Sequence, residues 1–178
     1  MRTGILIPGT LQRIVLVGLF VSVGCRGDGL SDYQRSENAR LTVMEKIQGR
    51  GVKLKEKYLD APAYVVDMRG MTVTDDLIDQ LGELQNITEL NLSKSTITDE
   101  QLGKLYGKNL CVRCFKLDLS HTGITDAGLD KMANIGVLSE LNVAGTRVTK
   151  AGTERLTKRK LDDKRVPAFL RRAPKIQF

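Results

Sequence analysis

Cys111 and Cys114 are the residues of this sequence whose types and spacing are best suited to chemistry, since only two residues separate them. A Cys-x-x-Cys pair can act as a redox couple or supply half of a zinc site. A closed zinc site would need two more protein ligands, and His121 is the only histidine of the chain. We therefore expect no metal site and no cofactor. Whether the pair has a redox role depends on whether its thiols are accessible.

His121 offers no separate route to catalysis. It follows an alternating apolar pair, where we expect the chain to turn and the side chain to be solvated. The sequence brings no nucleophile and orienting acid together with this imidazole. We therefore predict that the chain is not an enzyme.

Four segments of the chain share one apolar pattern, at successive spacings of 24, 27 and 24 residues. Such spacings are typical of stacked repeats. Each segment opens with an alternating pair: Val66/Met68, Leu90/Leu92, Leu117/Leu119 and Leu141/Val143. Later apolar positions also recur, first at Val73, Ile97, Ile124 and Val148, and then at Leu81, Leu105, Met132 and Leu156.

The spacing within each segment predicts a strand, a turn and a short helix. Alternating apolar residues indicate a strand with one buried face. The later apolar positions have helical spacing, as in Leu102 and Leu105. Thr98 and Gln101 fit a capping box at the start of that helix. Stacking four such units would form a parallel sheet and enclose the apolar residues between sheet and helices.

One copy, LDLSHTGITDAGLDKM from Leu117 to Met132, resembles leucine-rich repeats with Thr where other subtypes have Asn, a subtype common in bacterial surface lipoproteins. The resemblance covers roughly residues 63–156 in four copies. It implies an α/β leucine-rich-repeat solenoid, a short right-handed arc with the sheet on its concave side and the helices on its convex side. A similar subtype occurs in ubiquitin-ligase receptors, although this chain has no F-box segment.

The repeat pattern gives Cys111 and Cys114 a structural explanation. The other copies have Leu84/Ile87 and Ile135/Leu138 at the same two positions. Free cysteine packs as a small apolar side chain, so we expect both cysteines in the core. If the chain is exported, a disulfide between them remains open.

Outward-facing strand positions form three columns across the expected sheet. Equivalent residues on neighbouring strands lie about 4.8 Å apart, so the columns would pave the concave surface that repeat proteins use for binding. The acid–amide column comprises Asp67, Asn91, Asp118 and Asn142, the charged column Val65, Glu89, Lys116 and Glu140, and the third column Arg69, Ser93, Ser120 and Ala144. We predict that the polar residues of the first two columns contact a protein or glycan. The alternative is that Glu89, Lys116 and Glu140 only balance one another's charge.

Residues 1–25 have the layout of a secretory signal peptide, with positive charge ahead of the apolar run Ile14–Val23. The run is too short for an ordinary membrane span. Its end, VSVGC, resembles a bacterial lipobox, with Ser22 where a Leu is usual. The resemblance implies lipidation of Cys25 and anchoring to a membrane. The alternative is a plain cleaved signal with an incidental cysteine.

The segments that flank the repeats have separate expected roles. We predict a flexible tether at residues 26–35, an N-terminal cap of helix and strand at 36–62, and a basic C-terminal tail at 157–178. The net charge is +7, but residues 150–178 hold ten Lys or Arg against three acids, so a nucleic-acid-binding fold is not indicated. The tail is expected to be solvated, or alternatively to lie on an anionic membrane surface.

Together these features predict a non-catalytic binding or scaffold module that is exported, either lipid-anchored in the cell envelope or secreted. Its partner would be a protein or glycan on the concave face, with the membrane reached through lipidated Cys25. The alternative is an intracellular adaptor resembling the substrate-recognition repeats of ubiquitin-ligase receptors, which would require residues 1–25 to remain attached. A thiol enzyme using Cys111 and Cys114 is a third hypothesis, which requires accessible thiols.

Overall fold

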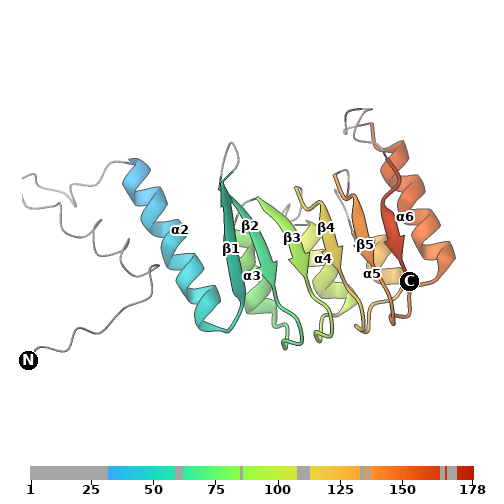
Figure 1. The fold of residues 1–178 in the computed structure, drawn as a ribbon, viewed down its shortest axis with the longest axis horizontal. Coiled ribbons are helices and arrows are strands. Elements are labelled where there is room, and N and C mark those ends of the chain that lie inside the picture. The colour runs from blue at the N-terminus through green and yellow to red at the C-terminus, as the bar shows by residue number, and fades with distance from the viewer. Residues whose placement is uncertain are drawn as a thin grey trace, which may run out of the picture. The chain divides into compact units, whose positions relative to one another are not determined.

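A single six-stranded sheet organises the fold, with its strands in chain order from β1 to β6 (Figure 1). The computed structural model describes residues 32–58, 62–84, 86–107, 113–132, 135, 137–164, 167 and 172–178. The strands are β1 (Lys53–Tyr58), β2 (Pro62–Asp67), β3 (Ile87–Asn91), β4 (Lys116–Asp118), β5 (Glu140–Asn142) and β6 (Lys175–Gln177). β1 runs antiparallel to β2, and each later strand runs parallel to the one before it.

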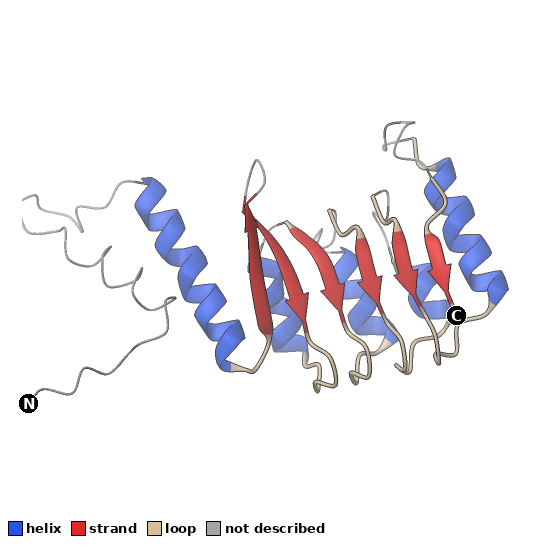
Figure 2. Ribbon diagram, viewed as in Figure 1, coloured by secondary structure: helices blue, strands red, loops and turns tan. Residues whose placement is uncertain are grey.

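Helices alternate with the parallel strands, because each parallel strand must be reached by a crossover. The helices are α2 (Asp32–Gly49), α3 (Asp75–Glu83), α4 (Asp99–Gly107), α5 (Asp126–Lys131) and α6 (Lys150–Asp162). Figure 2 shows α3, α4 and α5 behind the sheet. Each strand and its following helix form one repeat, from repeat 1 (β2 and α3) to repeat 4 (β5 and α6). The predicted α/β repeat solenoid is confirmed.

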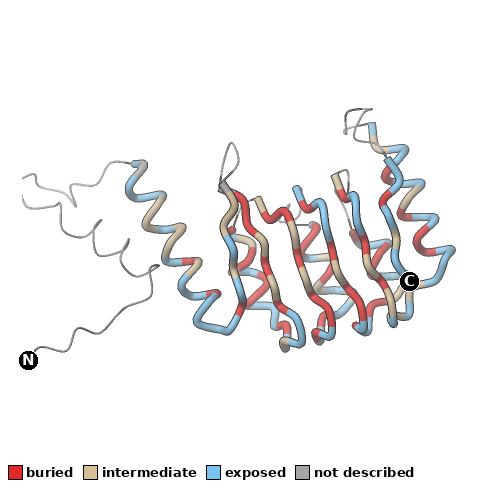
Figure 3. Tube along the Cα trace, in the orientation of Figure 1, coloured by how far each residue is buried: buried red, intermediate tan, exposed pale blue. Residues whose placement is uncertain are grey.

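The apolar residues shared by the repeats form the core between the sheet and the helices (Figure 3). The inward strand residues Val66, Leu90, Leu117 and Leu141 are at most 2% exposed. The helix residues Leu81, Leu105, Met132 and Leu156 are at most 1% exposed. Burying one such side chain contributes about 1.5–3 kcal/mol relative to leaving it in water, so this shared core stabilises the stack of repeats.

Threonine precedes each of the helices α3 to α6. Thr74, Thr125 and Thr149 have extended backbone, and the hydroxyl of each accepts a hydrogen bond from an amide of the first helical turn. Thr98 forms the predicted capping box. Its Oγ1 accepts from the Gln101 amide at 3.2 Å, while Gln101 Oε1 accepts from the Thr98 amide at 3.1 Å. Losing a cap of this kind costs a helix about 1 kcal/mol.

A carboxylate of one repeat also binds the threonine that precedes the next helix. Asp99 accepts from the Thr125 amide at 3.0 Å and from its hydroxyl at 2.6 Å. Asp126 accepts from the Thr149 amide and hydroxyl, both at 2.7 Å. These hydrogen bonds from Thr149 hold the pKa of Asp126 below its ordinary value. Each carboxylate therefore joins two consecutive repeats.

Gly128 and Gly152 leave room for these carboxylates. A Cβ added at Gly128 would overlap Asp99 Oδ1, and a Cβ added at Gly152 would overlap Asp126 Oδ1. The equivalent position in repeat 2 is Gln101, whose own side chain makes the cap. Where this helix position is glycine, a carboxylate of the preceding repeat binds the threonine before the helix. Where it is Gln101, the glutamine side chain caps the helix itself.

The N-terminal helix begins earlier than predicted. α2 starts at Asp32, so the tether prediction is wrong for residues 32–35, where Arg35 Nη2 lies 3.1 Å from Asp32 Oδ1. This spacing of three residues places the two side chains on one face of a helix. Residues 1–31 lie outside the described residues, so the signal, Cys25 and the rest of the tether are untested. Among the helices that the structure describes, none is both long and apolar enough to cross a membrane.

The second half of α2 packs at the β1 end of the core. Val43 and Ile47 are buried. Arg40 donates to Glu56 Oε1 and to Tyr64 Oη, both at 2.6 Å. The arginine therefore links α2 to β1 and to the first repeat strand.

The described parts of the C-terminal segment include the end of α6 and the strand β6, so the prediction of a solvated tail at residues 157–178 is wrong for these two elements. α6 continues to Asp162, and β6 pairs parallel with β5, which places Ile176 beside Leu141. Ile176 packs against the core. Without β6, the β5 edge would leave backbone groups unpaired, and one of them, the Val143 amide, donates to the Gln177 carbonyl at 2.8 Å.

Several basic residues of α6 hold this helix in place. Lys160 is 2% exposed, its Nζ donates to the Leu138 carbonyl, and burial lowers its pKa. Arg155 lies 3.2 Å from the Asp130 carboxylate, and Arg159 donates to the Asp130 carbonyl at 2.5 Å. Part of the positive charge predicted for a solvated tail is therefore used inside the fold.

Candidate functional site

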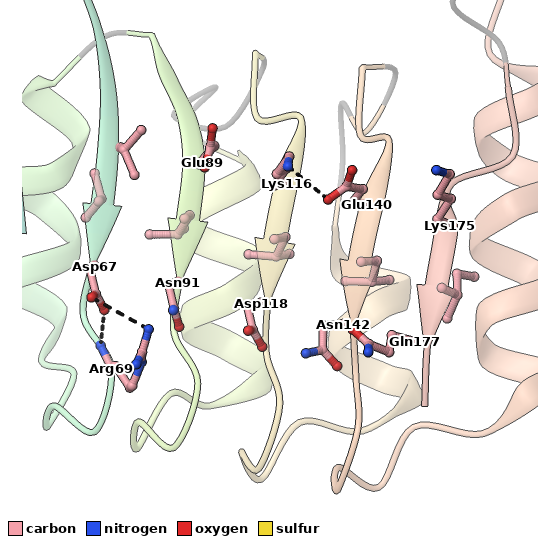
Figure 4. A pocket seen from close by; sticks show the side chains of 16 residues that line it. Asp67, Arg69, Glu89, Asn91, Lys116, Asp118, Glu140, Asn142, Lys175 and Gln177 are labelled. Atoms are coloured by element: carbon pink, nitrogen blue, oxygen red, sulfur yellow. Dashed lines mark hydrogen bonds and ion pairs between the residues drawn. The ribbon is translucent and has the colours of Figure 1, made fainter. Parts of the chain in front are cut away.

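The solvent-facing side of the sheet is an open groove with a volume of about 590 Å³. Figure 4 shows its polar side chains in two columns that cross the strands. The acid–amide column lies in register from Asp67 through Asn91 and Asp118 to Asn142, and the charged column from Val65 through Glu89 and Lys116 to Glu140. The structure therefore brings all of the predicted binding residues together on one surface.

Each member of the acid–amide column is fixed by a local hydrogen bond. Its side-chain oxygen Oδ1 accepts from the backbone amide two residues later, which is an Asx turn. The distances are 3.0 Å for Asp67, 2.9 Å for Asn91, 2.9 Å for Asp118 and 3.1 Å for Asn142. These bonds orient the column before any partner arrives, which lowers the entropy cost of binding.

The Asx turns also determine which atoms a partner would meet. Asp118 keeps its second carboxylate oxygen, whereas Asn91 and Asn142 keep the donor end of the amide. Asp67 Oδ2 lies 3.9 Å from Arg69 Nη2, so its charge is partly balanced. Along the column, acceptors and donors therefore alternate from one strand to the next.

Ion pairs neutralise most of the charged column. Lys116 Nζ lies 3.2 Å from Glu140 Oε2, and Lys57 of β1 lies 2.6 Å from Glu89 Oε1. Lys116 and Glu140 thus balance each other's charge, as the alternative to a binding role predicts. Glu89 instead pairs with a residue outside the column. Exposed pairs of this kind contribute only about 0–1 kcal/mol, so a charged partner could replace them at little cost.

Of the third column, only Arg69 lines the groove. Arg69 is exposed, but Ser93 and Ser120 are only 6% and 8% exposed, and Ala144 is half-buried. The alternation of faces stops where the strands stop, at the Asx turns. Ser93 turns back, so that its hydroxyl donates to Asn91 Oδ1 at 2.8 Å.

Lys175 and Gln177 are groove residues that the sequence reasoning missed. They extend the charged and acid–amide columns onto β6. Lys175 has no ion-pair partner among the residues that the structure describes. The signal was present in the polar–apolar–polar order of Lys175–Gln177, which matches that of Glu140–Asn142.

Of the residues considered for chemistry, the structure describes Cys114 and His121. Cys114 is 1% exposed and its Sγ donates to the Lys116 carbonyl at 3.1 Å, which fits the predicted core position. Cys111 lies outside the described residues. His121 occupies an exposed turn with a φ of 55°. Within the described ranges, no cluster of three or more His, Cys, Asp or Glu side chains could hold a metal ion.

The leucine-rich-repeat family model matches residues 83–102 and 116–133. These two segments belong to repeats 2 and 3, and they contain Glu89, Asn91, Lys116 and Asp118 of the groove. No curated protein matches this chain. The recognised repeats therefore include the centre of the groove.

Proposed function

We propose that this leucine-rich-repeat protein is a non-catalytic binding module whose groove holds a protein partner. The observation that carries the proposal is the pair of polar columns that line the groove across β2 to β6. Stacked repeats commonly use such extended surfaces for binding. The two columns are presented by strands rather than by loops, which favours a fixed recognition surface over an adaptable one.

The groove favours a partner with basic or hydrogen-bonding groups spaced to match the strands. Asp67 and Asp118 lie two strands apart, which corresponds to about 10 Å. Asn91 lies between them and offers amide donors. An extended polypeptide with basic side chains at this spacing would fit, and its carbonyls could accept from the intervening amide.

Asp118→Lys tests this assignment, because it reverses the carboxylate at the centre of the groove. The wild-type chain and the variant are each used to capture proteins from surface-labelled cells, and the captured proteins are quantified by mass spectrometry. The control is Glu83→Lys, which makes the same charge change at an exposed residue of α3. We expect a partner that the wild type and the control retain and Asp118→Lys loses at least about tenfold.

Equal capture by all three chains would contradict the groove assignment. Capture of glycans rather than proteins, lost in the same variant, would keep the groove and change the partner class. Thermal unfolding of Asp118→Lys separates lost binding from lost folding, since Asp118 is half-buried and the loss of its bond from the Ser120 amide should lower the free energy of unfolding by about 1 kcal/mol.

The proposal includes export and anchoring of this module in the cell envelope. The apolar run Ile14–Val23 and the lipobox-like end at Cys25 support it. The mass of the N-terminal peptide from protein isolated from cells tests this part. An acylated N-terminus at Cys25 is the expected result. Retention of residues 1–25 without acylation would favour the intracellular adaptor instead.

A further inference from the structure

The outer face of α6 carries four charged residues of alternating sign, each four residues from the next. They are Lys150, Glu154, Lys158 and Asp162, and all four are exposed. None of them has an ion-pair partner in the part of the chain that the structure describes. By contrast, Arg155 on the side of α6 that faces α5 pairs with Asp126 and Asp130.

A groove with a volume of about 340 Å³ runs beside this face. Its lining includes Thr157, Leu161 and Ile176, and it is rimmed by Glu154 and Lys158. Leu161 is 41% exposed, which is unusual for so large an apolar side chain in this fold. β6 is the last strand of the sheet, and Figure 1 shows it with α6 at one end of the solenoid. The last repeat of a solenoid exposes surface that internal repeats cover with their neighbours.

We propose that a second copy of this chain covers this end of the solenoid, with the two α6 helices packed antiparallel. A two-fold axis at the level of Leu156 would place residues at equal distances from Leu156 opposite one another. Glu154 of one copy would then lie beside Lys158 of the other. Lys150 would lie beside Asp162, and Leu161 beside Ala151. Each contact occurs twice, so the charge pattern is complementary to itself in this orientation.

Other arrangements are less favourable for the charges. Parallel packing of two α6 helices in register would place like charges together, which disfavours association. A head-to-tail arrangement would bring Lys175 of β6 towards Lys53 and Lys55 of β1, which are exposed at the other edge of the sheet. The four-residue spacing could instead serve pairs within α6, but the part of α6 that the structure describes contains no such ion pair.

The mass of the full chain, measured by light scattering in a non-ionic detergent over a range of concentrations, tests the proposal. We expect the wild type to shift from the monomer mass towards twice that mass. Glu154→Lys and Lys158→Glu each place like charges opposite one another, so each variant should weaken self-association by about tenfold or more. The control Glu83→Lys should behave like the wild type.

A mixture of the two variants gives the decisive result. The lysine introduced at position 154 of one variant would face the glutamate introduced at position 158 of the other. The unchanged Lys158 of the first variant would face the unchanged Glu154 of the second, so an equimolar mixture should form heterodimers. Recovery in the mixture also shows that both variants are folded. A wild type that stays monomeric, variants that associate like the wild type, or a mixture that stays monomeric would each overturn the proposal.

Discussion

The repeats are joined in two different ways. Between repeats 2 and 3, the Asp99 carboxylate binds Thr125 and a glycine at position 128 leaves room for it. At the joint between repeats 1 and 2, Gln101 stands in place of glycine, and its side chain caps its own helix at Thr98. The Gln101 amide group also reaches back to the Val73 carbonyl at 3.2 Å and to Asp75 Oδ1 at 3.1 Å.

The residue at one helix position determines which kind of joint forms. Glycine inside a helix costs about 1 kcal/mol relative to alanine. At positions 128 and 152 it admits a carboxylate that makes two hydrogen bonds to the next repeat, and hydrogen bonds to charged groups contribute about 1.5–3 kcal/mol each. Gln101 avoids the cost of glycine, and its side chain both caps its own helix at Thr98 and donates to the Asp75 carboxylate of repeat 1. At the glycine joints the carboxylate therefore binds the threonine of the next repeat directly, whereas at the other joint the Asp75 carboxylate is bound by the Gln101 amide.

The largest effect is expected for Gly128→Ala. In an open helix position this change would stabilise the protein, but here the new Cβ would displace the Asp99 carboxylate from Thr125. We expect the free energy of unfolding, measured in urea, to fall by about 2 kcal/mol. Gly107→Ala is the control, because nothing lies near a Cβ at that helical position.

A double-mutant cycle sharpens this prediction. In an Asp99→Ala background the carboxylate is gone, so Gly128→Ala should cost less than half as much as in the wild type. Equal costs in the two backgrounds would show that the glycine is needed for another reason than the carboxylate.

A smaller effect is expected for Gln101→Ala at the other kind of joint. The Thr98 amide would lose its acceptor, so the free energy of unfolding should fall by about 1 kcal/mol. Gln48→Ala in α2 is the matched control at an exposed helical position and should have little effect. A loss as large as that of Gly128→Ala would contradict the contrast between the joints.

The smallest effect is expected in the pH dependence at Asp126. Its pKa is lowered in the folded state from an ordinary value of 3.8, chiefly because the Thr149 amide and hydroxyl donate to it. The stabilisation is therefore fully present above the pKa of the unfolded state and is lost as the pH falls through the lower, folded-state pKa. Urea unfolding between about pH 6 and about pH 2 should show a smaller acid-dependent loss for Asp126→Asn than for the wild type. Parallel profiles would mean that the carboxylate joint adds no stability.

Much of the fold could be predicted because the repeats place the same kind of residue at the same position. Apolar pairs such as Leu117 and Leu119 recur at nearly constant spacing. This spacing predicted both the register of the strands and the outward columns. The Thr98 and Gln101 cap was predictable because it is local, with its two residues only three positions apart. The binding role of the columns stays a prediction.

The remaining features depend on contacts between segments that are far apart in the sequence. β6 is only three residues long and lies outside the repeat spacing, so Ile176 could not be aligned with Leu141 beforehand. Ser93 has an outward position by strand alternation, but the strand ends at Asn91 and the turn redirects it. The link from Asp99 to Thr125 spans 26 residues and becomes visible only when repeats are stacked.

Repeat 3 carries both halves of the carboxylate joint. It receives Asp99 through Thr125 and Gly128, and it offers Asp126 to the following repeat. A tandem copy of this unit would therefore find a matching half-joint on either side, and each added unit would widen the groove by one strand, about 4.8 Å. Repeat 4 has Lys150 where repeats 2 and 3 have an acid. Its Thr149 therefore binds the carboxylate of the preceding repeat, but it has no carboxylate at this position for a following one. A unit inserted next to repeat 3 would thus keep the joint on both sides, whereas a unit placed after repeat 4 would meet Lys150 instead of a carboxylate.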